Sequence, residues 1–156
     1  MADVIRTTKL DLKAAALAGL VAGLVFLIME MALVAATTGS PWGPPRMIGA
    51  IIMGEGVLPP PATFDLTVVM AAMVVHFGLS IVLGVVWALL AGRFAGWMAV
   101  VLGAAFGLVT YVFFFYGWTA VFPWFAMARG WIGIVSHIVF GVVLTWAYLR
   151  LRRRSV

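Results

Sequence analysis

Four long apolar stretches constrain this 156-residue chain more than any other feature of its sequence. They lie at about residues 14–36, 66–91, 97–116 and 131–149. Each is long enough to cross a bilayer as a helix, which takes roughly 20 mostly apolar residues. Barrel strands are excluded, because they alternate polar and apolar residues whereas these stretches are continuous. The sequence therefore predicts an all-α integral membrane protein, a single domain over residues 1–156 that forms a four-transmembrane-helix bundle.

Composition excludes the soluble classes of protein. Apolar residues make up 65% of the chain and charged residues 10%, where soluble domains carry about 25% charged residues. A domain of this size cannot bury that much apolar surface. A soluble enzyme, a disordered tail and a nucleic-acid-binding domain are therefore excluded. The chain has no cysteine, which also excludes zinc thiolate sites and iron–sulfur clusters.

The basic residues predict the orientation of the spans. Eight of them fall on one side of the four stretches and two on the other. The eight are Arg6, Lys9, Lys13, Arg93, Arg150, Arg152, Arg153 and Arg154, and the two are Arg46 and Arg129. Because basic residues concentrate in cytoplasmic segments, both termini are expected to be cytoplasmic. The net charge of +5 is then a topology signal rather than a sign of nucleic acid.

The first outer connection, residues 37–65, is long, and its apolar residues recur at helical spacing. Met47, Ile48, Ile51 and Ile52 fit one helical face, which predicts a short interfacial helix between residues 46 and 58 on the outer surface. Arg46 at its start and Glu55 near its end oppose the helix dipole. We therefore expect Arg46 to contact a partner in the outer region, either a lipid phosphate or another protein.

An internal repeat divides the chain into two halves. Gly19-Leu-Val-Ala-Gly23 in the first stretch matches Gly103-Ala-Ala-Phe-Gly107 in the third, and both are followed by Leu-Val. The second and fourth stretches each carry one histidine followed by a Gly-Val-Val sequence. This pattern predicts two parallel helical-hairpin repeats, an arrangement that occurs in transporters.

One polar residue per stretch lies on the same helical face as the small residues. These residues are Glu30, His76, Tyr111 and His137. Because small residues mark the faces along which membrane helices pack, all four side chains are expected to point inward. Glu30, Tyr111 and His137 fall roughly 8–10 Å below the outer boundary, and His76 somewhat deeper at roughly 12–15 Å. Together they form a predicted polar layer.

Four roles are open to this layer. His76 and His137 can be axial ligands of a b-type haem held between two helices. His76, His137 and Glu30 with Met73 can bind a metal, copper in particular because a thioether is a soft ligand. Glu30 and the histidines can form a path for protons or a small solute. In the fourth interpretation the layer binds nothing and only sets the register of the helices.

No catalytic motif accompanies these residues. The chain has no Gly-rich phosphate loop, no nucleophile elbow and no paired carboxylates. We therefore predict a non-enzymatic membrane component, a homo-oligomer or an accessory subunit of a larger membrane complex, with lipids as its other partners and no nucleic acid. The alternative is an intramembrane binding or transport module that uses Glu30, His76 and His137.

Several short motifs resemble one family. They are Gly19-Leu-Val-Ala-Gly23, Pro44-Pro45-Arg46, His76 with Leu79-Ser80-Ile81-Val82, Trp97 at the start of the third stretch, and His137 with the exit Tyr148 to Arg154. In this order they are similar to the YagU-like proteins, which are small, largely uncharacterised proteins of the bacterial inner membrane. The resemblance implies a four-helix protein in that membrane and supplies no established reaction. Family members can carry a histidine where this chain has Tyr111.

Overall fold

The computed structural model describes residues 10–91 and 94–152, and no strand occurs among them. The elements in chain order are α1 (Leu12–Thr38), α2 (Gly43–Met53), η1 (Glu55–Val57), α3 (Leu66–Ala91), α4 (Gly96–Val112), η2 (Phe113–Gly117), η3 (Trp118–Ala120), η4 (Pro123–Ala128) and α5 (Trp131–Leu151). Four helical segments are long and apolar enough to cross a membrane, namely α1, α3, α5 and the continuous run Gly96–Ala120. The prediction of an all-α protein with four helices of spanning length is confirmed.

The first and second spans begin at aspartate caps. The Asp11 carboxylate accepts the Ala14 N–H at 2.9 Å, and the Asp65 carboxylate accepts the Thr67 and Val68 N–H groups at 2.9 and 3.1 Å. Both carboxylates thereby satisfy amides that have no partner inside the helix and complement its positive end. α1 ends at Gly39, whose positive φ of 81° suits a glycine and few other residues.

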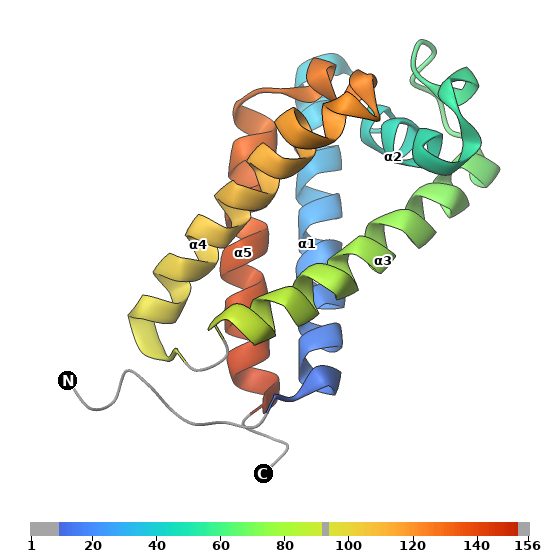
Figure 1. Cartoon of the computed structure of the whole chain (residues 1–156). Helices are drawn as coiled ribbons and strands as arrows, with labels where there is room; N and C mark the ends of the chain where they lie inside the picture. Colours follow the sequence, from blue (N-terminus) through green and yellow to red (C-terminus); the bar gives the residue numbers. More distant parts are fainter. Residues whose placement is uncertain (1–9, 92–93, 153–156) are drawn as a thin grey trace.

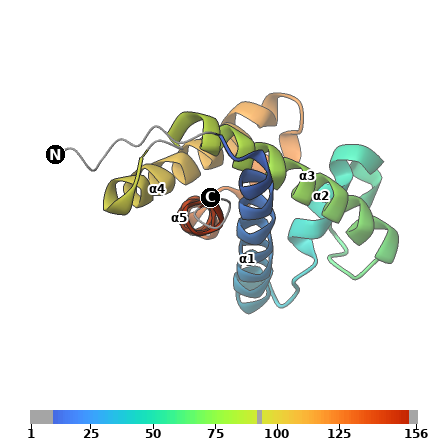
Figure 2. The ribbon, with the colours of Figure 1, turned by 90° about the horizontal axis from the view of Figure 1, so that it is seen from below.

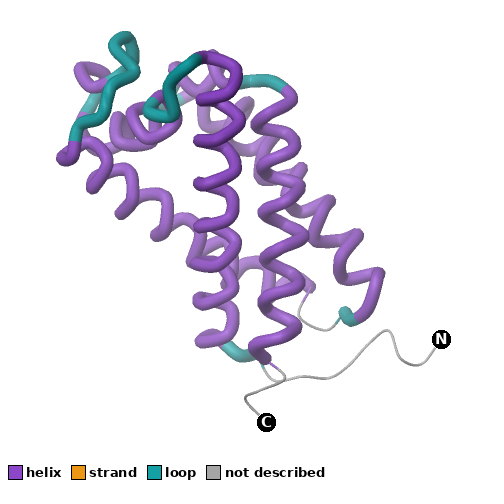
Figure 3. The backbone as a smooth tube through the Cα atoms, turned by 180° about the vertical axis from the view of Figure 1, so that it is seen from behind, coloured by secondary structure: helices purple, strands orange, loops and turns teal. Residues whose placement is uncertain are grey.

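The spanning helices form two layers. α1 packs along both α3 and α5, and α4 packs along α5, whereas α3 and α4 make few contacts with each other. Figure 1 shows the result: α3 and α4 diverge as a V, joined at the bottom and apart at the top. The view from below and the view from behind agree that this V lies on one side of the upright α1–α5 pair (Figures 2 and 3).

Close approach of the helices depends on glycine at the crossing points. A methyl group on Gly19 would clash with the Ser80 backbone of α3, and one on Gly107 would clash with the His137 backbone of α5. A methyl group on Gly141 would likewise meet the α4 backbone. Without these side chains the helix backbones touch directly, which is how membrane helices gain packing energy in a solvent as apolar as themselves.

Two hydrophobic clusters hold the bundle together. The first, which we call the alanine core, lies where α1, α3 and α5 meet and consists of Ala14, Ala15, Ala18, Ala22, Phe26, Trp87, Ala88, Phe140, Leu144, Ala147 and Tyr148. The second, which we call the aromatic cap, consists of Met47, Ala50, Tyr111, Phe115, Trp124 and Phe125. The aromatic cap lies at the end of the molecule that holds residues 39–65 and 118–130, hereafter the loop end.

The first long connection contains a short helix, α2, which begins earlier than predicted. It starts at Gly43 rather than Arg46, so Pro44 and Pro45 form its first turn. Proline suits this position because it lacks an N–H, and the first-turn N–H groups have no helical partner in any case. The helix is joined to the second loop by the Trp124 indole N–H, which donates to the Met47 carbonyl at 3.0 Å.

The third span changes its winding near the loop end. Residues Phe113–Gly117 form a π-helix, in which the Trp118 N–H donates to the Phe113 carbonyl five residues back. The sequence pattern does not predict this segment. Such single turns are rare and occur frequently at functional sites, and this one shifts the aromatic side chains that follow Tyr111.

Part of the predicted orientation signal lies outside the described residues. This applies to Arg6, Lys9, Arg93, Arg153 and Arg154. Lys13, Arg150 and Arg152 are described, and all three lie at the end of the bundle opposite the loop end (Figure 1).

Candidate functional site

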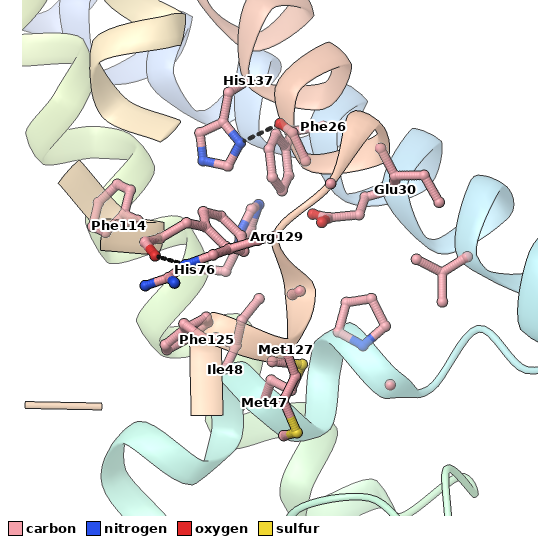
Figure 4. Close-up of a pocket in the computed structure, with 18 of the residues that line it drawn as sticks. Phe26, Glu30, Met47, Ile48, His76, Phe114, Phe125, Met127, Arg129 and His137 are labelled. Atoms are coloured by element: carbon pink, nitrogen blue, oxygen red, sulfur yellow. Dashed lines mark hydrogen bonds between the residues drawn. The ribbon is translucent and has the colours of Figure 1, made fainter. Parts of the chain in front are cut away.

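A cavity of about 460 Å³ lies between the alanine core and the aromatic cap. The lining comes from several elements, among them Phe26 and Glu30 of α1, His76 of α3, Phe114 of the π-helix and His137 of α5, and α4 contributes no residue to it. α2 and η4 cover it from the loop end (Figure 4). Trp87 of α3 and Phe106 of α4 are in contact, with ring centroids 5.3 Å apart, and the two helices diverge toward the loop end (Figure 1).

The cavity reaches the surface at the loop end. Its lining includes exposed side chains there, among them Met127, Arg129 and Trp131. Arg129 lies at this rim with its guanidinium engaged: Nε donates to the Phe115 carbonyl at 2.7 Å, and the group lies 4.2 Å above the Tyr116 ring. A small molecule could therefore enter from the loop end without separating the spanning helices.

Glu30 reaches into the cavity from α1 (Figure 4). Only 8% of its surface is exposed. Within the described part of the chain its carboxyl group has neither a hydrogen bond nor an ion pair, yet its oxygens are not sealed off by protein atoms. An ionisable group inside a bilayer costs at least about 2.5 kcal/mol on the most lenient scale. Glu30 is thus a buried acid that lacks a partner among the described residues.

His76 joins α3 to α1. Its side chain is 9% exposed, and its Nε2 donates to the Gly23 carbonyl at 2.8 Å. A carbonyl oxygen can only accept, so this nitrogen carries the proton and a neutral ring keeps its lone pair on Nδ1. Among the described residues no hydrogen bond engages Nδ1, and this atom is not sealed off. His76 therefore presents an acceptor to the cavity.

His137 also presents an acceptor nitrogen to the cavity, but its hydrogen bond lies within its own helix. It is 7% exposed, and its Nδ1 donates to the Gly133 carbonyl one turn back in α5 at 2.8 Å, the dashed line beside its ring in Figure 4. The lone pair of a neutral ring is then on Nε2. The structure brings Glu30, His76 and His137 to one cavity, as the sequence predicted for these members of the polar layer.

Tyr111 lies behind this group rather than in the cavity lining. Its ring centroid is 5.7 Å from that of His137, and it stacks on Phe115 at 5.0 Å. The Tyr111 hydroxyl accepts the Gly130 N–H at 3.2 Å, which holds the start of α5. Tyr111 therefore orients His137 and fixes the loop end.

The geometry does not suit a haem between the two histidines. The Phe26 ring lies next to both, with centroids 5.6 Å from His76 and 4.9 Å from His137. A porphyrin held by both imidazoles needs a flat slot between them, and Phe26 fills that space.

The residues suggested for a copper site are not gathered around one point. Met73 does not line the cavity. Among the described residues, no group of three or more His, Cys, Asp or Glu side chains is placed to hold a metal ion. The arrangement of these side chains therefore does not support the copper hypothesis.

Arg46 has its partners within its own loop. Its guanidinium donates to the Thr63 carbonyl at 2.8 Å, to the Val57 carbonyl at 3.0 Å and to the Thr63 hydroxyl at 3.1 Å. The structure thus gives Arg46 partners in the segment 57–63, and these three bonds explain the mismatch with the helix dipole. A contact of Arg46 with a lipid phosphate or another protein stays a prediction.

Sequence reasoning missed the aromatic wall of the cavity. The wall is formed by Phe26, Phe114, Phe115, Trp118, Phe125, Trp131 and Phe140. The aromatic run after Tyr111 was visible, but an ordinary helix would spread its rings over all sides. The π-helix directs two of them, Phe114 and Phe115, to the cavity.

No protein family, curated protein or solved structure matches this chain. The resemblance to the YagU-like proteins therefore stays a prediction.

Proposed function

We propose that this protein is a non-enzymatic intramembrane binding module that takes a small molecule into the cavity at Glu30, His76 and His137. The observation that carries the proposal is the Glu30 carboxyl group, which is buried, unpartnered among the described residues and open to the cavity. A polar group that only set helix register would be hydrogen-bonded to a neighbouring helix, as His76 is to Gly23. Glu30 instead faces a space of the size that ligand pockets have.

The helix contacts support a two-repeat architecture and hence transport as the wider function. In the first hairpin, Gly19 and Gly23 pack on α3 at Ser80, one turn after His76. In the second, the equivalent glycines of α4 pack on α5 at and after His137. We infer that the two hairpins are copies that place their histidines on either side of one cavity, as in transporters built from repeats.

A ligand screen tests the binding function. The purified protein in nanodiscs is compared with Ile48→Trp, which places a larger side chain in the cavity from α2 and leaves the residues of the spanning helices unchanged. Small apolar amines, acids and alcohols are added, and the melting temperature is measured. At least one class is expected to stabilise the wild type more than Ile48→Trp, because a ligand at 100 times its Kd adds about 2.7 kcal/mol and the tryptophan narrows the site. If no class distinguishes the two proteins, the cavity is not a binding site.

A flux assay tests the transport function. Proteoliposomes with an entrapped pH dye report proton movement across the membrane at several external pH values. Glu30→Gln is expected to alter the pH-dependent rate, and Glu55→Gln, an exposed acid in the loop, is expected to leave it unchanged. Equal rates for the wild type and Glu30→Gln, or no flux in the wild type, would contradict proton transport through Glu30 and would leave the binding function to the ligand screen.

Several expectations stay predictions: a homo-oligomer or an accessory subunit, both termini in the cytoplasm, a bacterial inner membrane, and an interfacial position for α2. Gentle extraction followed by native mass measurement addresses the first. A strictly monomeric particle would contradict it.

A further inference from the structure

We propose that the ligand of this cavity is an organic cation that carries N–H donors on an apolar body, a protonated amine or amidine. The inference rests on the proposed binding function and adds the chemical class of the ligand. It follows from three independent properties of the lining: the direction of its hydrogen-bonding groups, its charge and its aromatic surface.

The polar groups inside the cavity present acceptors. Glu30 offers its carboxylate oxygens, His76 offers Nδ1 and His137 offers Nε2, because the other ring nitrogens donate to backbone carbonyls. The hydroxyl groups follow the same pattern, since Ser80 donates to the His76 carbonyl at 2.8 Å and Thr38 to the Val34 carbonyl at 2.9 Å. A ligand that satisfies this set must supply donors.

The side-chain donors that line the cavity lie at its rim. They belong to Arg129, Trp118 and Trp131, whose side chains are partly or fully exposed at the loop end. The Arg129 guanidinium also donates to the Phe115 carbonyl and to the Thr119 hydroxyl, at 2.7 and 3.3 Å. Among the described residues, an anionic ligand would therefore find its cationic partner only at the rim of the cavity, where the guanidinium is already engaged, and the Glu30 carboxylate deeper within it.

The charge of the lining points the same way. Glu30 has no ion pair within the described residues, and both imidazoles are held by carbonyl oxygens. A buried carboxylate is stable only when a cation or several hydrogen bonds compensate it. A ligand cation beside Glu30 supplies that compensation, with the N–H groups that do not face Glu30 free to donate to His76 and His137.

The aromatic wall suits the rest of such a ligand. Phe26 and Phe140 lie below the polar groups, and Phe114, Phe115 and Phe125 lie toward the loop end. Aromatic faces attract cations within about 6 Å and also pack against apolar groups. The volume of about 460 Å³ leaves room for an apolar body as well as the charged head.

A matched set of probes tests the ligand class. The probes are 4-phenylbutylammonium, its N-trimethyl derivative, 4-phenylbutanol and 4-phenylbutanoate, which share one apolar body and differ in charge and donors. Binding of each radiolabelled probe to protein in nanodiscs is measured for the wild type, Glu30→Gln, Glu55→Gln and Ile48→Trp. Binding that Ile48→Trp lowers is assigned to the cavity, because partitioning into the same lipid does not depend on this substitution.

The ammonium probe is expected to bind most tightly, followed by the trimethylammonium, the alcohol and the carboxylate. Glu30→Gln is expected to weaken ammonium binding about thirtyfold or more, the effect of removing one partner of a buried charge pair. Glu55→Gln is expected to match the wild type. Cavity-dependent binding that favours the alcohol or the carboxylate would overturn the cation assignment and leave the binding function standing. No cavity-dependent binding of any probe would overturn both.

Discussion

The buried polar side chains of this protein satisfy their hydrogen bonds in different ways. Thr110, Thr145 and His137 donate to carbonyls of their own helices, and His76 donates across to α1. Glu30 turns to the cavity instead. The comparison sets Glu30 apart as a buried carboxyl group that faces the cavity and has no hydrogen-bond partner among the described residues, whereas polar groups in a bilayer generally find protein partners.

Ser136 is a second buried polar residue without a partner in the described part of the chain, and unlike Glu30 it does not line the cavity. Its side chain is fully buried, and its hydroxyl has no hydrogen-bond partner among the described residues. Because a buried unpaired hydroxyl costs about 1–3 kcal/mol, Ser136→Ala is expected to leave the stability unchanged or raise it. Thermal unfolding in detergent measures the effect. A marked loss of stability would show that the hydroxyl has a partner, such as a buried water.

At the scale of elements, the glycines at the helix crossing points set the positions of both histidines. Gly107→Ala would place a methyl group against the His137 backbone, whereas Gly78 has open space around it. We expect Gly107→Ala to destabilise the protein by about 1–3 kcal/mol, the range for overpacking. Gly78→Ala should be neutral or slightly stabilising, since alanine is the better helix former. Equal melting temperatures for the two variants would contradict direct contact between α4 and α5.

The hydrogen bonds of Arg46 to its own loop lead to a second prediction at this scale. Arg46→Met removes three hydrogen bonds to residues 57–63, and the free energy of opening this segment should fall by about 1–2 kcal/mol. Arg46→Lys should lower this free energy by less than Arg46→Met does, because an ammonium keeps the charge but lacks the planar set of donors of the guanidinium. Amide hydrogen exchange in the segment is the measurement. Unchanged protection in Arg46→Met would mean that the hydrogen bonds of Arg46 do not stabilise this segment.

The elements differ in how far the sequence predicts them. The spans were predictable because burial in lipid demands long apolar helices, and α3 has the predicted bounds of 66–91. The start of α2 was missed because the two prolines were interpreted as part of the loop, although both suit a first helical turn. The π-helix could not be predicted, since no local residue pattern distinguishes one π turn from an α turn.

At the scale of the whole molecule, the site is enclosed by segments that lie far apart in the sequence. The inward direction of Glu30, His76 and His137 was predictable because each lies on a face of small residues. The cavity was not predictable, because side chains of α1, α2, α3, α5 and the segment 114–130 enclose it together, and no local sequence pattern sets their relative positions. A closed bundle with the same inward residues would have had no space at Glu30.

Accessibility of position 30 tests the central claim most directly. The chain has no cysteine, so Glu30→Cys and Ile28→Cys each carry a single thiol at nearly the same depth of α1. Ile28 is 62% exposed on the outer face of the bundle, where lipid would surround it. A small, charged thiol reagent added to protein in bilayers is expected to modify the Glu30→Cys variant and to leave the Ile28→Cys variant unmodified. The reaction at position 30 should slow when Ile48→Trp is added. Equal reactivity at both positions, or none at position 30, would contradict a ligand cavity at Glu30.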